Sequence, residues 1–247
     1  IILLGLLITS VYALLGPVDF SQQKHAPPKG RAINNIIELQ IALARLGFSP
    51  GPIDGTHGSQ TKQTLGAFQL SRGLSPTGEM DPSLDKWLRI EEPTHAHIEL
   101  TEAALAGITP KPATWRERGQ LEHFGYHSAL EMVAERTCTD PVYIHSINPQ
   151  INWSALRPGD RALAPLVPPF RIGEKIAGIE IELAKRELRA LDASGNMLVH
   201  CPASIARDVA KRPVGRLEVK VRVENPNYTF NPDILTATAS LEGISEK

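Results

Sequence analysis

Residues 36–74, IIELQIALARLGFSPGPIDGTHGSQTKQTLGAFQLSRGL, decide the fold of the N-terminal part of the chain. Apolar residues recur three or four positions apart in their first third, which predicts an amphipathic helix. Asn35 precedes this helix as an N-cap, and Gly47 follows it as a C-terminal stop. The turn at 52–55, Pro-Ile-Asp-Gly, then separates this helix from a second helical pattern.

The second helix is expected between Ser59 and Gly73, and Asp81-Pro82 opens a third with an N-cap and a proline in its first turn. Three residues of the third helix are expected to point inward: Leu84, Trp87 and Leu88. A single short helix cannot bury its apolar stripe alone. Residues 33–88 are therefore predicted to form a three-helix bundle.

This arrangement, with the sequence PGPIDG at 50–55, resembles the peptidoglycan-binding domain of bacterial cell-wall enzymes. The resemblance implies that the partner is peptidoglycan, both glycan strands and stem peptides. It also implies an extracytoplasmic location in the cell envelope, either periplasm or cell wall. It assigns no ligand contacts within the bundle.

Composition limits the remaining possibilities. The 247 residues are 42% hydrophobic but only 5% aromatic, which suits several small cores better than one large core. The fold class expected is multi-domain α+β, because helical periods in the N-terminal part are followed by an alternating period from residue 171. The formal net charge of −1 provides no overall basic field, so no nucleic-acid partner is expected.

The first 18 residues are apolar, and no charged residue occurs before Asp19. As a helix they would span ~27 Å, close to the thickness of a hydrocarbon core. Residues 1–18 are expected to be a signal peptide or a membrane anchor. Leu14 and Gly16 fit a cleavage site badly, which favours the anchor and a membrane partner. Residues 19–32 are polar and carry paired prolines, which indicates a linker.

Residues 89–124 are expected to be a connecting region with little independent core and one short strand at 97–100. Residues 125–167 follow with two short helices, the second opened by Asp140-Pro141, then a turn at 157–160 and a strand ending at Pro165. This order resembles a lysin motif (LysM). The opening strand of that motif is missing immediately before Ala129, which leaves its two-stranded sheet in doubt.

The LysM resemblance implies a groove for a chitin-like glycan on two neighbouring loops. The candidate glycan-binding residues are Thr137, Thr139, Asp140, Asn148, Gln150 and Asn152. Amide and hydroxyl groups in loops suit the hydrogen bonding of sugars. The alternative is that Asp140 and Asn148 only cap and terminate short helices, and both readings stay open.

From residue 171 the apolar period changes from helical to alternating, which predicts a β-rich domain. A hairpin turn is expected at 192–196, between strands at 187–191 and 197–204. A further half-buried strand is expected at 217–223, where Leu and Val alternate with charged residues.

The order of these strands, followed by Arg-Pro-Val-Gly at 212–215 and Asn-Pro-Asn-Tyr at 225–228, is similar to the first half of an L,D-transpeptidase domain. Arg212 stands where that family has Thr. The resemblance implies that a His takes the proton of a Cys thiol and that the thiolate attacks the stem-peptide carbonyl between a diamino acid and a D-residue. Backbone N–H groups hold the oxyanion, the D-residue leaves with a proton on its amine, and a thioester remains. An amine of a neighbouring stem then resolves the thioester and completes a crosslink.

The catalytic signature of that family, Ser-His-Gly-Cys, does not occur in the sequence. The expectation is a C-terminally truncated chain without transpeptidase activity and without catalytic residues of its own. His200 and Cys201 are adjacent on a predicted strand and should point to opposite faces, so no nucleophile pair is expected. Cys138 and Cys201 are expected to be separate buried thiols.

The histidines at 95, 97, 123 and 127 lack the spacing and partner residues of a metal site, so no metal or cofactor is expected. The alternative function is a non-catalytic peptidoglycan-binding or scaffolding protein. A wall hydrolase with other catalytic residues is a second alternative. It would need a Glu or metal constellation, which the sequence does not offer.

Overall fold

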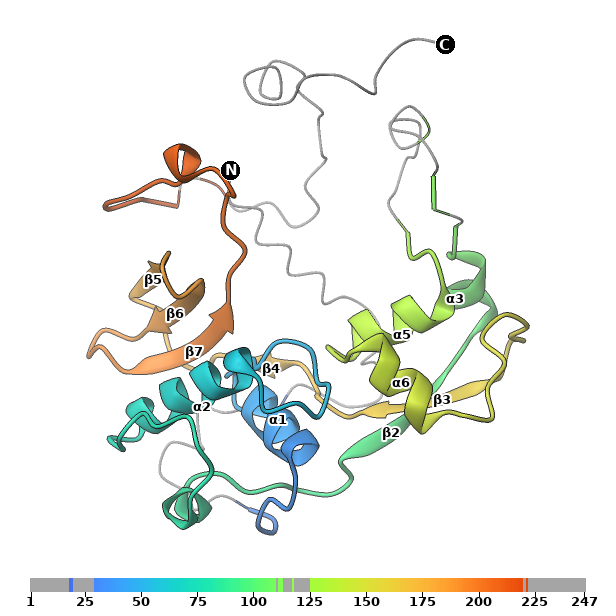
Figure 1. The fold of residues 1–247 in the computed structure, drawn as a ribbon, viewed down its shortest axis with the longest axis horizontal. Helices are drawn as coiled ribbons and strands as arrows, with labels where there is room; N and C mark the ends of the chain where they lie inside the picture. Colours follow the sequence, from blue (N-terminus) through green and yellow to red (C-terminus); the bar gives the residue numbers. More distant parts are fainter. Residues whose placement is uncertain are drawn as a thin grey trace. The chain divides into compact units, whose positions relative to one another are not determined.

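The computed structural model describes residues 18–19, 29–109, 111–112, 117, 125–219 and 221. The chain divides into a larger unit, residues 1–110 and 125–206, and a smaller unit, residues 111–124 and 207–247. Helices and small sheets make the larger unit a mixed α+β structure, as the change of apolar period along the sequence predicts (Figure 1).

The predicted signal peptide or anchor, 1–18, lies outside the described residues except for its last residue. That residue belongs to the short strand β1 (Val18–Asp19), which pairs in parallel with β4 (Phe170–Arg171). Among the described residues, no helix has the length and apolar character needed to cross a membrane.

The predicted bundle is present as α1 (Ile36–Arg45), α2 (Ser59–Ser71) and the 3-10 helix η1 (Pro82–Lys86). Asn35 caps α1, accepting a 2.9 Å bond from the backbone N–H of Glu38. Gly47 follows α1 at φ +82°, the left-handed geometry expected at a helix stop.

The first hydrophobic core lies between these three helices. Its fully or almost fully buried members are Leu39, Ile41, Leu43, Phe48, Ile53, Leu65, Phe68, Leu84, Leu88 and Ile90. The rings of Phe48 and Phe68 meet edge to face with centroids 5.3 Å apart. Burying a side chain of this size contributes about 1.5–3 kcal/mol, so this core stabilises the bundle against its chain entropy.

One inward-pointing prediction is wrong. Leu84 and Leu88 are buried, whereas Trp87 is 40% exposed. The 3-10 helix ends at Lys86, and the backbone of Trp87 is no longer helical (φ −123°, ψ −28°). The helix therefore does not hold the Trp87 side chain on the buried face.

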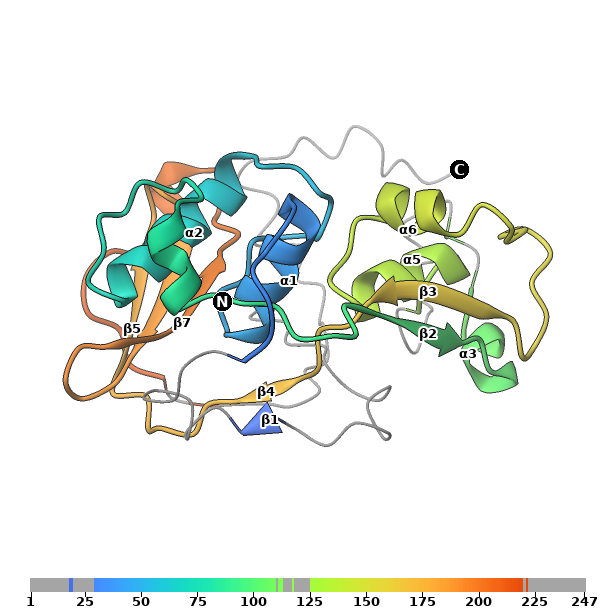
Figure 2. The ribbon, with the colours of Figure 1, turned by 90° about the horizontal axis from the view of Figure 1, so that it is seen from below.

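A strand–helix–helix–strand arrangement follows the bundle. The strands are β2 (His95–Glu99) and β3 (Arg161–Pro165), which pair antiparallel with His97 opposite Leu163. The helices are α5 (Ala129–Arg136) and α6 (Pro141–Ile147), and both lie beside this strand pair (Figures 1 and 2). The short helix α3 (Glu102–Ala106) follows β2.

The strand that pairs with β3 is therefore β2, which lies about thirty residues before Ala129. Leu100, directly after β2, is fully buried in a second core with Met132, Val133 and Ile144. The segment 89–124, expected to have little independent core, thus supplies Leu100 to a core made mainly by residues 129–164. A strand and its following Leu are stabilised by distant residues that local sequence does not reveal.

The third sheet contains β5 (Gly178–Glu182), β6 (Glu187–Leu191) and β7 (Met197–Pro202) in antiparallel order. The predicted hairpin turn at 192–196 joins β6 to β7, and Asp192 accepts bonds from the backbone N–H groups of Ser194 and Asn196.

Backbone bonds join these parts within the larger unit. The N–H of Ser49 donates to the carbonyl of His200 in β7, and the N–H of His200 donates to the carbonyl of Gly47 (2.8 and 3.1 Å). On another side, the N–H of Ile53 donates to Cys138 O at 2.8 Å, and the N–H of Asp140 donates to Ile53 O at 3.0 Å. The bundle is thereby attached to both β7 and the segment before α6.

In the smaller unit, Asp208 caps the 3-10 helix η2 (Val209–Lys211). The predicted strand at 217–223 is wrong for its described residues, 217–219 and 221, which form no strand and have exposed apolar side chains. An alternating pattern becomes a strand only when a neighbouring strand accepts its hydrogen bonds, and none is paired with these described residues.

Candidate functional site

The loop between α1 and α2, residues 46–58, carries the PGPIDG sequence, and a buried glutamine of α1 holds its shape. The Gln40 amide nitrogen donates to Asp54 Oδ1 (2.8 Å), Thr56 O (3.2 Å) and Thr61 Oγ1 (3.1 Å). Its carbonyl oxygen accepts from the backbone N–H groups of Asp54 and Gly55 (3.1 and 2.9 Å). One side chain, 1% exposed, thus bonds four polar groups of the loop and one of α2.

Gly55 is required at its position. It has φ +75°, and a Cβ there would lie 3.1 Å from Ile37 Cδ1. A side chain would therefore be strained in its backbone and crowded against α1.

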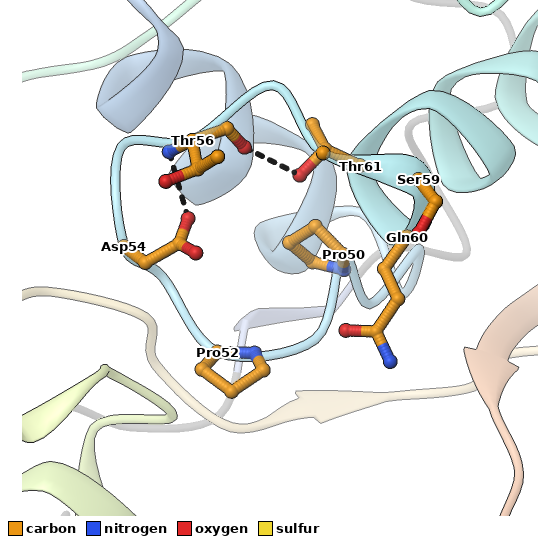
Figure 3. A pocket seen from close by; sticks show the side chains of 8 residues that line it. Pro50, Pro52, Asp54, Thr56, Ser59, Gln60 and Thr61 are labelled. Carbon is orange, nitrogen blue, oxygen red and sulfur yellow. Dashed lines mark hydrogen bonds between the residues drawn. The ribbon is translucent and has the colours of Figure 1, made fainter.

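The outer side of this loop forms a groove of about 230 Å³. Its labelled lining residues are Pro50, Pro52, Asp54, Thr56, Ser59, Gln60 and Thr61 (Figure 3). The backbone N–H of Thr56 donates to Asp54 Oδ1 at 2.8 Å, and Thr61 Oγ1 donates to Thr56 O at 3.1 Å. Two prolines and two short hydrogen-bonded turns give a rigid rim with polar groups along it.

A second groove, of about 340 Å³, shares Asp54 and Thr56 with the first. Its other lining residues belong to the segment that opens α6: Asp140, Val142, Tyr143 and Ser146. The two grooves therefore adjoin at the Asp54 turn. Carboxylate, hydroxyl and phenol groups with few apolar neighbours suit an extended polar polymer better than an enclosed small molecule.

The six predicted glycan-binding residues fall into two groups. Thr137, Thr139 and Asn148 are buried, at 4%, 4% and 0% exposure. Thr137 Oγ1 donates to the carbonyl of Val133 at 2.8 Å and contacts Thr139 Oγ1 at 3.0 Å. These two hydroxyls are thus occupied within the protein, which favours a structural role.

Asn148 joins α6 to β3. Its amide nitrogen donates to the carbonyls of Ile144 and Leu163, and its oxygen accepts from the N–H of Leu163 (2.8, 2.8 and 2.7 Å). Asp140 caps α6 by accepting from the N–H of Val142 at 2.7 Å. These contacts match the alternative reading, in which Asp140 caps the start of a short helix and Asn148 terminates it.

The remaining predicted residues, Gln150 and Asn152, are exposed, and Asp140 also lines the second groove. Contact of any of the six with glycan stays a prediction. Sequence reasoning did not identify Asp54, Thr56, Tyr143 and Ser146 as neighbours. The Asp-Gly turn was interpreted only as a turn, and no local signal places it against α6.

A buried His–carboxylate pair lies apart from these grooves. His200 Nε2 is 3.1 Å from Glu187 Oε2, and His200 Nδ1 is 3.3 Å from Thr64 Oγ1. Gln63 of α2 and Arg189 also donate to the Glu187 carboxylate. The His200 side chain is 1% exposed and both of its ring nitrogens have partners, so this imidazole is structural.

Burial raises the pKa of Glu187, but the hydrogen bonds from Gln63, His200 and Arg189 outweigh it and lower that pKa to about 2. Burial lowers the pKa of His200, and the bond to Glu187 offsets only part of this. At neutral pH the pair is therefore a carboxylate beside a neutral imidazole.

The two cysteines are free. Cys201 stands opposite Leu188 on the sheet face away from His200, as the strand alternation predicts, and burial raises the pKa of its thiol. Cys138 is exposed and Cys201 is only partly buried, so the expectation of two buried thiols is wrong. Cys138 occupies a turn with φ +53° after α5. Within the described part of the chain, no group of three or more His, Cys, Asp or Glu residues could hold a metal ion.

Comparison with known proteins identifies the bundle. Residues 33–88 match the family model described as "Putative peptidoglycan binding domain". A search of curated proteins finds no match to the chain. The matched residues contain α1, α2, η1, the PGPIDG turn and the first groove, so the chain carries a peptidoglycan-binding domain at its N-terminal side.

Proposed function

We propose that this protein is an exported envelope protein that binds peptidoglycan through two adjoining modules. The first is the peptidoglycan-binding domain at 33–88. The second is the strand–helix–helix–strand module, β2 to β3, which is similar to a LysM apart from the additional short helix α3 after β2. The observation that carries the proposal is that the two grooves share Asp54 and Thr56 as lining residues, on a domain of this family.

The chemistry of the grooves supports a polymer ligand. Glycan strands present hydroxyl and acetamido groups at regular intervals, and these can bond with the carboxylates of Asp54 and Asp140 and with the hydroxyls beside them. Two weak sites on one attached pair of modules raise the effective concentration of the second contact once the first has formed. Neither groove has to be deep for the polymer to be held.

Sedimentation with purified peptidoglycan sacculi tests this proposal. The full chain is expected to pellet with sacculi and to stay in solution without them. Thr56→Val and Ser146→Ala, one on each module, are each expected to weaken retention several-fold, and together more than either alone. Ser83→Ala, at an exposed residue of η1 outside both grooves, is the matched control. A chain that does not pellet refutes wall binding.

We further propose that β5–β7 begin an L,D-transpeptidase domain, with 171–247 as its N-terminal half. Support comes from the antiparallel three-strand order and the Arg-Pro-Val-Gly segment at 212–215. In this reading the wall-binding modules bring stem peptides to a Cys-dependent crosslinking centre. The chain itself is expected to be inactive, because Cys201 faces the apolar side of the sheet and the Ser-His-Gly-Cys signature does not occur in the sequence.

The alternative is a non-catalytic scaffold with the same binding modules. The coding sequence after Lys247 distinguishes the two, since only an L,D-transpeptidase continues into Ser-His-Gly-Cys. Transfer of a labelled D-amino acid or amine to stem peptides is the direct assay. It should be absent for the 247-residue chain and for its Cys201→Ser variant alike. Transfer that disappears with Cys201→Ser would contradict the assignment of an inert thiol.

A further inference from the structure

Arg72, at the C-terminal end of α2, lies between two aromatic rings. Its guanidinium carbon is 5.1 Å from the centroid of Phe68 and 5.8 Å from that of Trp87. Phe68 belongs to the buried core, whereas Trp87 is 40% exposed. The stack therefore runs from the interior of the bundle to its surface.

The polar contacts of Arg72 differ from those of the other arginines in residues 30–90. Arg31 pairs with Glu38 and Glu92, Arg45 donates to three backbone carbonyls, and Arg89 donates to the carbonyl of Gly30. Among the described residues, Arg72 has no acceptor for its side-chain N–H groups and no carboxylate partner. Its Nε atom is buried without a hydrogen bond.

This arrangement leaves a positive charge only partly compensated. Burial lowers the pKa of Arg72, since water is removed from the guanidinium and no carboxylate of the described residues replaces it. The rings attract the cation through their faces, but they accept none of its N–H bonds. The terminal Nη groups are the donors that an anion could use, because Nε itself is covered.

We propose that Arg72 and Trp87 form a carboxylate-binding site for the anionic stem peptides of peptidoglycan. Arg72 would pair with a carboxylate through its Nη groups, and the exposed indole would contact the adjoining apolar or sugar surface. Stem peptides carry several free carboxylates next to such groups. The inference rests on the proposed function, and it names the part of the polymer that this end of the bundle would contact.

A purely structural role predicts different behaviour. A cation at a helix C-terminus is favoured by the helix dipole, and stacking on Phe68 and Trp87 would stabilise the bundle without any ligand. In that case Arg72→Gln lowers thermal stability but leaves ligand affinity unchanged. Affinity and stability must therefore be measured on the same variants.

The test is calorimetric titration of the full chain with a purified disaccharide tetrapeptide, and with the same compound after amidation of its carboxylates. The unmodified chain is expected to bind the free acid at least tenfold more tightly than the amide. Arg72→Gln is expected to lose this difference. Trp87→Ala is expected to weaken both ligands, and Trp87→Phe less so. Lys86→Gln, a change of the same charge at the neighbouring exposed residue, is the control and should keep the preference.

Arg72→Lys keeps the charge without the planar fork, so its affinity should be intermediate, and it replaces Arg72→Gln if that variant fails to fold. Equal affinity for acid and amide, or full affinity in both Arg72 variants, overturns the inference. So does failure of the unmodified chain to bind the soluble fragment. Retention on sacculi in that last case would leave the proposed wall binding intact, whereas loss of both would remove it too.

Discussion

Replacing Glu187 by Gln tests whether the buried polar contact between β6, β7 and α2 stabilises the larger unit. The Glu187 side chain is 5% exposed and receives bonds from Gln63, His200 and Arg189. The glutamine amide in the Glu187→Gln variant has the same shape as the carboxylate but no charge. Its NH₂ group is itself a donor and would face the donors of the neighbouring side chains, where the carboxylate offered an acceptor. The variant therefore leaves donors unpaired in a buried place.

Two estimates of the cost agree. Removing one partner of a buried, hydrogen-bonded ion pair costs about 3–5 kcal/mol. The pKa of Glu187 falls from 4.5 to about 2 on folding. At about 1.4 kcal/mol per pKa unit, this shift corresponds to roughly 3 kcal/mol of stability at neutral pH. The loss is large beside the ~5–15 kcal/mol that stabilises a typical domain.

The assay is urea denaturation of the full chain, followed by far-UV circular dichroism at several pH values. At pH 7 Glu187→Gln is expected to lower the free energy of unfolding by about 3 kcal/mol. A carboxylate whose pKa is lowered on folding stabilises the fold above its unfolded pKa, and this contribution disappears as pH falls from 4.5 towards about 2. The difference between the two proteins should therefore shrink over that range.

Glu180→Gln, on the same sheet with a side chain 61% exposed, is the matched control, and its effect should stay within about 0.5 kcal/mol. A Glu187→Gln variant as stable as the unmodified chain at pH 7 would refute the reasoning. So would a stability difference that persists unchanged at pH 2.

Three further substitutions test His200 and two buried residues of the bundle. Because burial lowers the pKa of His200, the folded state favours the neutral imidazole. The stability that the neutral His200 side chain contributes should be fully present above pH 6.5 and should decrease as the pH falls below 6.5. Melting curves recorded at several pH values should lose this dependence in the His200→Asn variant. Gln40→Leu should destabilise the bundle by about 1–3 kcal/mol and speed hydrogen exchange at the Asp54 and Gly55 amides; unchanged exchange there would contradict the role of Gln40. Phe68→Ala should cost about 3–5 kcal/mol in urea denaturation, whereas Leu70→Ala, at a 52% exposed residue of the same helix, should cost far less.

Features that depend on a few neighbouring residues could be predicted from the sequence. Asn35 caps α1, Gly47 ends it, and Asp81 with Pro82 opens η1, because each needs only a local backbone geometry. The hairpin turn at 192–196 follows for the same reason. These local signals were sufficient to identify the bundle whose family the comparison then matched.

Features that join distant segments could not be predicted in this way. The pairing of β2 with β3 spans more than sixty residues, and it decides that Leu100 is buried and that the strand–helix–helix–strand module is complete. The second groove exists only because Ile53 bonds to the segment before α6, which brings Asp54 beside Tyr143.

The sequence by itself determined the helices, caps and turns of this protein, and through them its wall-binding domain. Tertiary structure alone decided that His200 is enclosed beneath α2, that Trp87 is exposed, and that Arg72 has no acceptor among the described residues. The reason is physical: capping and periodicity are settled by neighbours along the chain. Burial and charge compensation depend on which remote side chains arrive in the same place.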